Sequence, residues 1–241
     1  DEKGGTRLGF YYFDYTYFIF IVPALLLSLG AQIMVKSTFQ KYSGVRSARG
    51  MTGQDAAEAV LRYGFVQGVD IRPISGNLTD HFDPRTGVIS LSSPVYSVSS
   101  IAAVGVAAHE AGHAIQHAVG YAPIKLRSAL VPITNLGSSL SMPIILIGLL
   151  LPVQYNFVVL IGIGLYSLMV LFQFVTLPVE FNASARAIRA LRETGVLYPE
   201  ELQGAKRVLQ AAALTYLAAM FSSLMSLLRL LVIVGGRRRR D

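Results

Sequence analysis

Four long apolar stretches limit what this chain can fold into. They cover residues 17–35, 130–151, 157–179 and 208–228, and the last can continue past Arg229 to residue 234. Each is near the roughly 20 residues that a helix needs to cross a hydrocarbon core. The whole chain is 53% hydrophobic and 15% charged, with a mean hydropathy of +0.51, which is too apolar for an ordinary soluble domain. The sequence therefore predicts a mainly α membrane protein with about four transmembrane helices.

The predicted organisation follows from these stretches. A small α+β domain, with a motif-bearing helix and a β-hairpin, is expected between the first and second transmembrane helices. In order, the predicted segments are an N-terminal tail (1–16), a transmembrane helix (17–35), an α+β segment (36–129), a transmembrane hairpin (130–179), a helix and loop (180–207), a transmembrane helix (208–234) and a basic tail (235–241). Aromatic residues 10–17 are typical of an interfacial belt. Asn135 and nearby serines suit a helix packed on protein rather than lipid.

Turn and cap signals predict the elements of the α+β segment. Thr52 opens a helix in the manner of a capping box. Residues 69–74 are typical of a strand. Residues 78–92 predict a β-hairpin in which Gly87 takes the left-handed turn position. The second strand of this hairpin, residues 88–92, could offer an edge to an extended substrate backbone.

An HExxH box, formed by His109, Glu110 and His113, follows the hairpin. Residues 101–119 contain no proline and are preceded by serines that can cap a helix, so the box is expected on an α-helix. Positions i and i+4 share one helix face, where two imidazoles can converge on one zinc ion. Glu110 then lies beside the open coordination position and can accept a proton from water.

A catalytic zinc needs a third protein ligand, and the chain has no cysteine to supply one. His117 lies about 12 Å along the helix from His109, too far for one tetrahedral ion. His81 lies far upstream. Glu180 stands at the end of the third apolar stretch, where a carboxylate is costly without a partner, although it could simply mark the helix end. The predicted ligands of one Zn²⁺ are therefore His109, His113 and Glu180.

Topology favours this ligand set, because a hairpin of the second and third stretches returns residue 180 to the side of residues 36–127. Lysines and arginines near the spans are concentrated on that side, which favours a multi-pass protein of the cell membrane with a cytoplasmic-facing site. If all four segments cross, the arginines at 237–240 lie on the opposite side, against this rule. Either the last segment does not fully cross or the tail tolerates the violation. Anchoring to anionic lipid accounts for the net charge of +7 without nucleic acid.

Several segments together resemble the bacterial membrane-bound neutral zinc metallopeptidases, the YugP-like family. The segments that carry the resemblance are residues 76–85, 107–117, 120–123, 127–132 and 176–184. The resemblance implies a membrane-embedded zinc endopeptidase. The CAAX-processing and heat-shock membrane proteases are more loosely similar, and their later glutamate is followed four residues on by an Asp that supports a zinc histidine. Here that position is Ser184, which leaves Asn182 and Ser184 as candidates for this supporting role.

The expected reaction is hydrolysis of a peptide bond in a peptide or protein substrate, membrane proteins included. Glu110 is the expected general base, and His81 is a candidate oxyanion donor for which a purely structural role is the alternative. One rival function is a catalytically silent zinc-binding membrane scaffold, its metal closed off by a fourth ligand such as His81 or His117. Another is a zinc hydrolase with a non-peptide substrate. The sequence indicates no particular oligomeric state or regulatory partner.

Overall fold

The computed structural model describes residues 15–237, which fall into two compact units. The span unit holds the chain up to Gly30, Arg127–Val175 and the chain from Tyr216 onward, and the sheet unit holds Ala31–Leu126 and Thr176–Thr215. Each unit is therefore built from segments far apart in the sequence. Residues 1–14 of the predicted tail, including most of the aromatic belt, and residues 238–241 lie outside the described chain.

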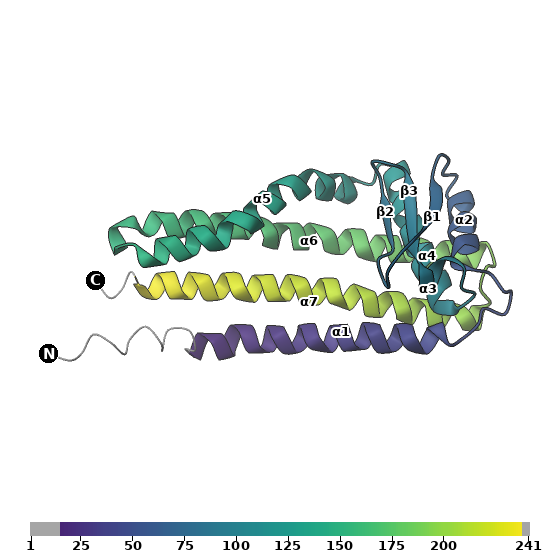
Figure 1. The fold of residues 1–241 in the computed structure, drawn as a ribbon, viewed down its shortest axis with the longest axis horizontal. Helices are drawn as coiled ribbons and strands as arrows, with labels where there is room; N and C mark the ends of the chain where they lie inside the picture. Colours follow the sequence, from purple (N-terminus) through teal and green to yellow (C-terminus); the bar gives the residue numbers. More distant parts are fainter. Residues whose placement is uncertain (1–14, 238–241) are drawn as a thin grey trace. The chain divides into compact units, whose positions relative to one another are not determined.

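Figure 1 shows the order of the helices and strands along the chain. The helical elements are η1 (Tyr17–Ile21, a π-helix), α1 (Val22–Ser43), α2 (Gly53–Tyr63), α3 (Ser93–Tyr96), α4 (Ile101–Ala118), α5 (Ala122–Leu150), η2 (Val153–Tyr155, a 3₁₀ turn), α6 (Asn156–Glu193) and α7 (Pro199–Arg237). The strands are β1 (Asp70–Ile74), β2 (His81–Asp83) and β3 (Val88–Ser92). The predicted fold class is confirmed: a mainly α membrane protein with a small α+β part between the first and second long helices.

Four helical segments are long and apolar enough to cross a membrane, as predicted: Tyr17–Ser43, Ala122–Leu150, Val153–Glu193 and Pro199–Gly236. They extend beyond the apolar stretches because polar but helix-favouring residues continue them. The segment after residue 180, rich in alanine and arginine, prolongs α6 to Glu193. Glu180 therefore lies within a continuous helix, and the alternative that it marks a helix end is wrong.

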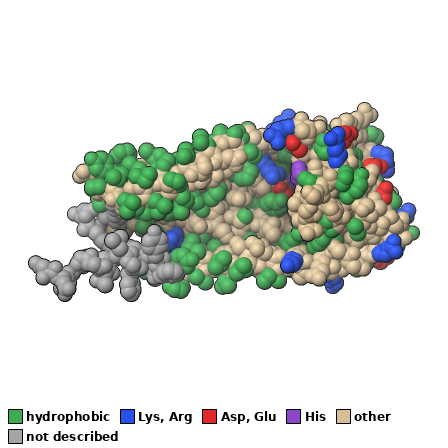
Figure 2. Space-filling model, viewed as in Figure 1, with side chains coloured by type: hydrophobic (Ala, Val, Ile, Leu, Met, Phe, Trp, Pro, Cys, Tyr) green, Lys and Arg blue, Asp and Glu red, His purple; other side chains and the backbone are tan. Residues whose placement is uncertain are grey.

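Within the span unit, α5 packs on α6 through glycines. A Cβ atom placed on Gly137 would lie 3.0 Å from the carbonyl oxygen of Leu165, and one on Gly162 would lie 2.6 Å from the side chain of Ile145. Small residues let membrane helices approach in this way. The helix that carries Asn135 therefore packs on protein as expected, with Ser141 buried, although the Asn135 side chain itself is exposed. In Figure 2 hydrophobic side chains dominate the visible surface of the span unit, and charged side chains gather on the sheet unit.

The sheet unit contains three strands in the order β1-β3-β2. The predicted hairpin is confirmed, because β2 pairs antiparallel with β3 and Gly87 has φ +67°. β1 pairs with β3 in parallel, with Ile71 opposite Ile89. The prediction that residues 88–92 form an edge is therefore wrong. β3 is paired on both sides, and the edges of the described sheet are β1 and β2.

Helix α2 packs on α4 to form the interior of the sheet unit. The predicted capping box is present at its start: Thr52 Oγ1 accepts from the Asp55 amide at 3.2 Å, and Asp55 Oδ2 accepts from the Thr52 amide at 2.8 Å. Small buried side chains let the two helices approach closely, among them Ala56, Ala57, Val60, Ala103, Ala107 and Ala111. This packing holds α4, which carries the HExxH box, against the sheet.

Candidate metal centre

Helix α4 presents both histidines of the HExxH box on one face. The Ser100 hydroxyl accepts a hydrogen bond from the Ala103 amide at 3.1 Å and caps the start of the helix. One turn separates His109 from His113, whose ring centroids lie 4.7 Å apart with the planes at 83°. The helix thus brings two imidazoles to one point, as the i, i+4 spacing predicts.

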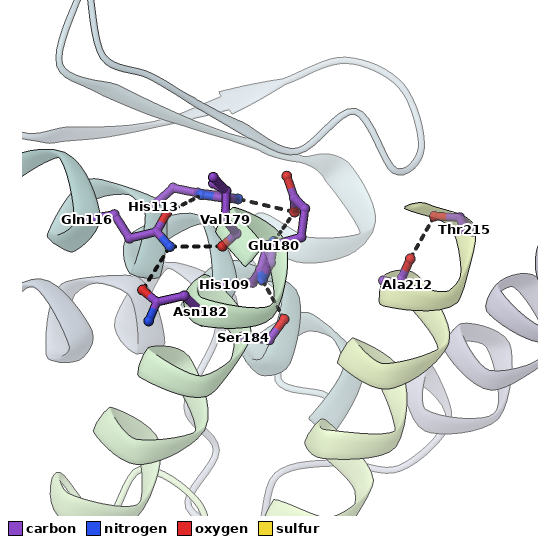
Figure 3. A network of polar contacts seen from close by, with 9 residues as sticks. All are labelled: His109, His113, Gln116, Val179, Glu180, Asn182, Ser184, Ala212 and Thr215. Carbon is purple, nitrogen blue, oxygen red and sulfur yellow. Dashed lines mark hydrogen bonds and ion pairs between the residues drawn. The ribbon is translucent and has the colours of Figure 1, made fainter. Parts of the chain in front are cut away.

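Glu180 reaches the same point because α6 approaches α4 closely at Gly112. A Cβ atom placed on Gly112 would lie 2.6 Å from the carbonyl oxygen of Ala183, well inside contact distance. Only glycine allows this approach without a shift of one backbone. Figure 3 shows Glu180 on α6 with its carboxylate directed at the two histidines.

The three side chains form one compact cluster. Glu180 Oε2 lies 3.2 Å from His109 Nε2 and 3.5 Å from His113 Nε2. One ligand atom from each residue lies within 4.8 Å of the others. Ligands at about 2.0–2.1 Å from a tetrahedral zinc are about 3.3–3.4 Å from one another. The measured separations are therefore close to those around a single ion.

A chain of hydrogen bonds, drawn from Asn182 to His113 in Figure 3, fixes the proton of His113. Arg186 Nε can only donate, and it bonds to Asn182 Oδ1 at 2.7 Å. That oxygen also accepts from Gln116 Nε2 at 3.0 Å, and the same amide nitrogen donates to the Val179 carbonyl at 2.8 Å. The remaining amide oxygen, Gln116 Oε1, faces His113 Nδ1 at 3.0 Å, so Nδ1 carries the proton. The Nε2 lone pair of His113 is left to face Glu180.

His109 has a comparable support. Its Nδ1 lies 3.1 Å from the hydroxyl of Ser184, which can accept the ring proton and leave Nε2 free. Of the two supporting residues considered from the sequence, Ser184 therefore contacts a histidine directly. Asn182 reaches His113 only through Gln116.

Without a proton or a cation this arrangement would be unfavourable, because the Nε2 atoms of His109 and His113 and the carboxylate of Glu180 would face one another as three hydrogen-bond acceptors. The Nε2 lone pair of His113 and the Glu180 carboxylate face each other, so a proton or a cation must lie between them. Burial by itself would lower the pKa of His113, but the contact with Glu180 and the charges of Glu110 and Glu180 outweigh it, and the pKa is raised. Glu180 is only 2% exposed, so water offers little relief. Two imidazoles and one carboxylate are a donor set that suits Zn²⁺.

Glu110 follows His109 on α4 and is 9% exposed. Its negative charge acts on His113, which places its carboxylate in the electrostatic neighbourhood of the cluster. A buried carboxylate next to a metal-binding group is the arrangement that general-base chemistry requires.

The other two histidines lie outside the cluster. His81, on β2, is exposed, and its Nδ1 lies 2.8 Å from the Thr79 carbonyl oxygen. His117 is also exposed and meets the Phe82 ring edge-on, with centroids 6.1 Å apart. Within residues 15–237 the cluster has three potential ligands, and neither histidine provides a fourth.

Gln116 is a site residue that the sequence pattern did not reveal. It is fully buried, three residues after His113 and on the same side of α4. The available signal was a lone amide within an alanine-rich, buried helix. Such a group needs a hydrogen-bonding partner, and the histidine one turn earlier provides one.

The comparisons with known proteins define the class. Residues 17–235 match the family described as "Putative neutral zinc metallopeptidase", and the chain belongs to this family, as the sequence resemblance indicated. Among individual relatives, the chain is 45% identical over 222 residues to "Putative membrane protease YugP" of Bacillus subtilis (strain 168), an alignment that covers 91% of this chain and 98% of the relative. No solved structure matches the chain.

Proposed function

We propose that this protein is a zinc-dependent endopeptidase embedded in the cell membrane. The observation that carries the proposal is the convergence of His109, His113 and Glu180, with the proton of His113 held on the ring nitrogen away from the cluster. This geometry leaves the metal-facing atoms free for one Zn²⁺. Family membership and the name of the Bacillus relative support a peptidase over other hydrolases.

His109, His113 and Glu180 would hold the ion, and a fourth position would stay open, since no further ligand lies in the described cluster. Bound zinc would lower the pKa of water towards neutrality and polarise the scissile carbonyl. Glu110 accepts the proton of the attacking water on its carboxylate and then delivers it to the leaving amine. The reaction consumes one water: the peptide C–N bond and one O–H bond of the water break, and a C–O bond at the carbonyl carbon and an N–H bond on the leaving amine form.

His81 is proposed as the donor to the developing oxyanion. Because its Nδ1 faces the Thr79 carbonyl, that nitrogen is the donor in the neutral ring. Nε2 can then donate to an oxyanion only when the ring is protonated. The substitution His81→Ala should lower kcat and leave the zinc content unchanged. An unchanged kcat removes His81 from the mechanism and leaves the zinc chemistry intact.

The central test is the substitution Glu110→Gln in the full chain, purified in detergent. We expect peptide cleavage to be lost while one zinc per chain remains bound, because Glu110 is not a ligand. Cleavage of a casein-type substrate and zinc content measured on the same sample give both readouts, and a chelator should abolish the wild-type activity. Full activity in Glu110→Gln would refute the mechanism. Zinc without any cleavage in the wild type would favour a silent scaffold.

The ligand assignment is tested separately with a matched pair on α6. Glu180→Ala removes a proposed ligand, whereas Glu193→Ala removes an exposed carboxylate at the end of the same helix. Loss of an outer-shell partner alone costs about 10–100-fold in metal affinity, so Glu180→Ala should cost more than about 100-fold. Equal zinc affinity in the two variants would exclude the proposed ligand set.

The active site is proposed to face the cytoplasm, with peptides or proteins, including membrane proteins, as substrates. The bias of lysine and arginine supports this orientation. These 241 residues contain no cysteine, so a single Thr86→Cys substitution in the sheet unit gives one labelling site among them. A membrane-impermeant thiol reagent should label it only in inverted vesicles. Labelling in intact cells would reverse the orientation without affecting the zinc assignment.

A further inference from the structure

A groove of about 900 Å³ lies within the sheet unit, between α1, α6 and α7. This volume is within the range of pockets that bury small ligands. Its surface includes Ser184, whose hydroxyl contacts His109 Nδ1. The groove therefore lies on the Nδ1 side of His109, away from the ring nitrogen that faces Glu180. A molecule in the groove would occupy a different place from a substrate bound at the open metal position.

The charged side chains that line the groove are all of one sign. Its five charged lining residues are all cations: Lys41, Arg189, Arg192, Lys206 and Arg207. Each of them is exposed, and none has an acidic partner within 4.0 Å among residues 15–237. The hydrogen bond that Arg207 donates to the Tyr42 hydroxyl leaves its charge uncompensated. The groove is thus suited to an anion.

The apolar lining is found at the opposite end of the groove. Along each of the three helices, the lining changes from basic to apolar in the direction of the apolar membrane-spanning segment. On α1 it runs from Lys41 to Met34, and on α7 from Lys206 to Leu214. On α6 the apolar end is Phe181, which is 51% exposed. Met34 and Leu214 are likewise exposed, at 49% and 38%.

We propose that this groove binds an anionic phospholipid of the surrounding bilayer, with the phosphate at the basic end and the acyl chains along the apolar end. Both halves of the ligand are required by the lining. A soluble anion would leave the exposed Met34, Phe181 and Leu214 side chains uncovered, and an acidic peptide would place polar backbone against them. A zwitterionic lipid would leave the five cations without a net countercharge. The ligand would contact Ser184 and so one support of the metal site.

The test uses the full-length protein in detergent, titrated with short-chain phosphatidylglycerol or with phosphatidylcholine of the same chain length. Lipid retention by native mass spectrometry and the shift in Tm give two independent readouts. We expect phosphatidylglycerol to bind more tightly and to raise Tm more. The double substitution Lys206→Gln/Arg207→Gln should weaken this binding about 30-fold, from the contribution of each basic side chain near an anionic lipid. Arg189→Gln/Arg192→Gln should act in the same direction and serves if the first variant does not fold.

The matched control is Arg72→Gln/Arg85→Gln, which removes two charges of the sheet unit outside the groove. Both arginines pair with nearby aspartates on the exposed surface. Phosphatidylglycerol binding should be unchanged in this variant. Equal loss in the control, or equal binding of the two lipids, would overturn the proposal. The proposal would also be overturned if inorganic phosphate or polyglutamate raised Tm as much as phosphatidylglycerol. An effect of phosphate would assign the groove to a soluble anion, and an effect of polyglutamate would assign it to an acidic peptide.

Discussion

The two units of this protein satisfy their polar side chains in different ways. In the span unit, hydroxyls mostly bond to carbonyls three or four residues back in their own helix, as in Ser138, Ser139, Ser141, Ser167, Ser223 and Ser226. In the sheet unit, buried polar groups bond between elements. Gln116 of α4 donates to α6, and Asp80 accepts from the Ser92 hydroxyl and amide. Most of these hydroxyls in the span unit therefore do not link its helices, although Ser222 of α7 bonds to the Ser28 hydroxyl and the Ala24 carbonyl of α1. In the sheet unit, the bonds of Gln116 fix the position of α4 against α6.

The burial of apolar side chains also differs between the two units. The sheet unit encloses a cluster of buried residues from α2, α4, α6, α7 and the sheet. The buried cluster of the span unit is small, with Ile145, Val159, Ile163 and Val234 as its members. Many leucines of the span unit are exposed, as is expected for side chains that face lipid, because lipid is as apolar as leucine itself. The stability of the sheet unit should therefore depend on packing between its own side chains, and the stability of the span unit on contact with the surrounding lipid or detergent.

The largest expected difference is between two leucines of α6. Leu191 is fully buried in the sheet unit, and Leu160 is 50% exposed in the span unit. Leu191→Ala should lower the free energy of unfolding by about 2–5 kcal/mol, because it leaves a cavity. Leu160→Ala should cost less than about 1 kcal/mol, since lipid or detergent fills the space. Denaturant unfolding in one detergent compares the two. Equal losses would show that the units do not differ in this way.

A second contrast uses two glycines. Alanine at Gly112 would place a Cβ 2.6 Å from the Ala183 carbonyl oxygen, whereas nothing lies within 4 Å of a Cβ at Gly164. Gly112→Ala should cost about 1–3 kcal/mol and weaken zinc binding, because α6 must move away from α4. Gly164→Ala should stabilise its helix by up to about 1 kcal/mol. Unfolding midpoints and zinc titrations distinguish these outcomes, and unchanged behaviour of Gly112→Ala would mean that α6 can shift without cost.

The buried amide of the sheet unit is tested by Gln116→Leu, which keeps the side-chain volume similar and removes the acceptor for His113 Nδ1. Zinc affinity should fall about 10–100-fold, as is usual when the partner of a metal-binding histidine is removed. The same exchange at Asn135, exposed in the span unit, should leave affinity unchanged. Zinc competition with a fluorescent chelator measures both. An effect of equal size at Asn135 would argue for a general loss of structure.

The smallest expected effect concerns the α2 cap. Thr52→Ala should lower stability by about 1 kcal/mol at neutral pH. Hydrogen bonds from the Thr52 side chain and amide lower the pKa of Asp55. A lowered folded-state pKa means that this stabilisation is present above the ordinary Asp pKa of about 3.9 and is lost as the pH falls through the folded value. The Tm difference between wild type and Thr52→Ala should therefore narrow from pH 7 to pH 3.

In the span unit, Ser167→Ala is the counterpart, since that hydroxyl bonds only to the Ile163 carbonyl of its own helix. Its effect on Tm should be near zero at both pH values. If the Tm difference between wild type and Thr52→Ala stayed constant from pH 7 to pH 3, the stabilisation by the cap would come from Thr52 without a contribution from the Asp55 charge.

Elements fixed by local chemistry were predictable from the sequence. Thr52, Gly87 and Ser100 each specify a cap or a turn within a few residues, and all three occur as expected. The long apolar runs likewise indicated the four long helices. Pairing of β1 with β3 was not predictable in the same way, because no turn sets the register of two parallel strands.

Among site residues, the HExxH box and Glu180 carry recognisable chemistry, and the structure brings His109, His113 and Glu180 together. The position of Glu180 inside α6 was missed because the apolar run ends there while the helix continues. Gln116 was missed for another reason. Its role depends on Asn182 and Arg186, which approach it only after α4 and α6 have packed.

The origin of the cluster from two distant helices has a consequence for biogenesis. Glu180 is translated 71 residues after His109, and the whole of α5 lies between them. A nascent chain therefore exposes both imidazoles before their carboxylate partner has left the ribosome. Coordination of a metal by all three proposed ligands therefore requires that α6 has been synthesised and has packed on α4, and a chain truncated before Glu180 would lack one of the three.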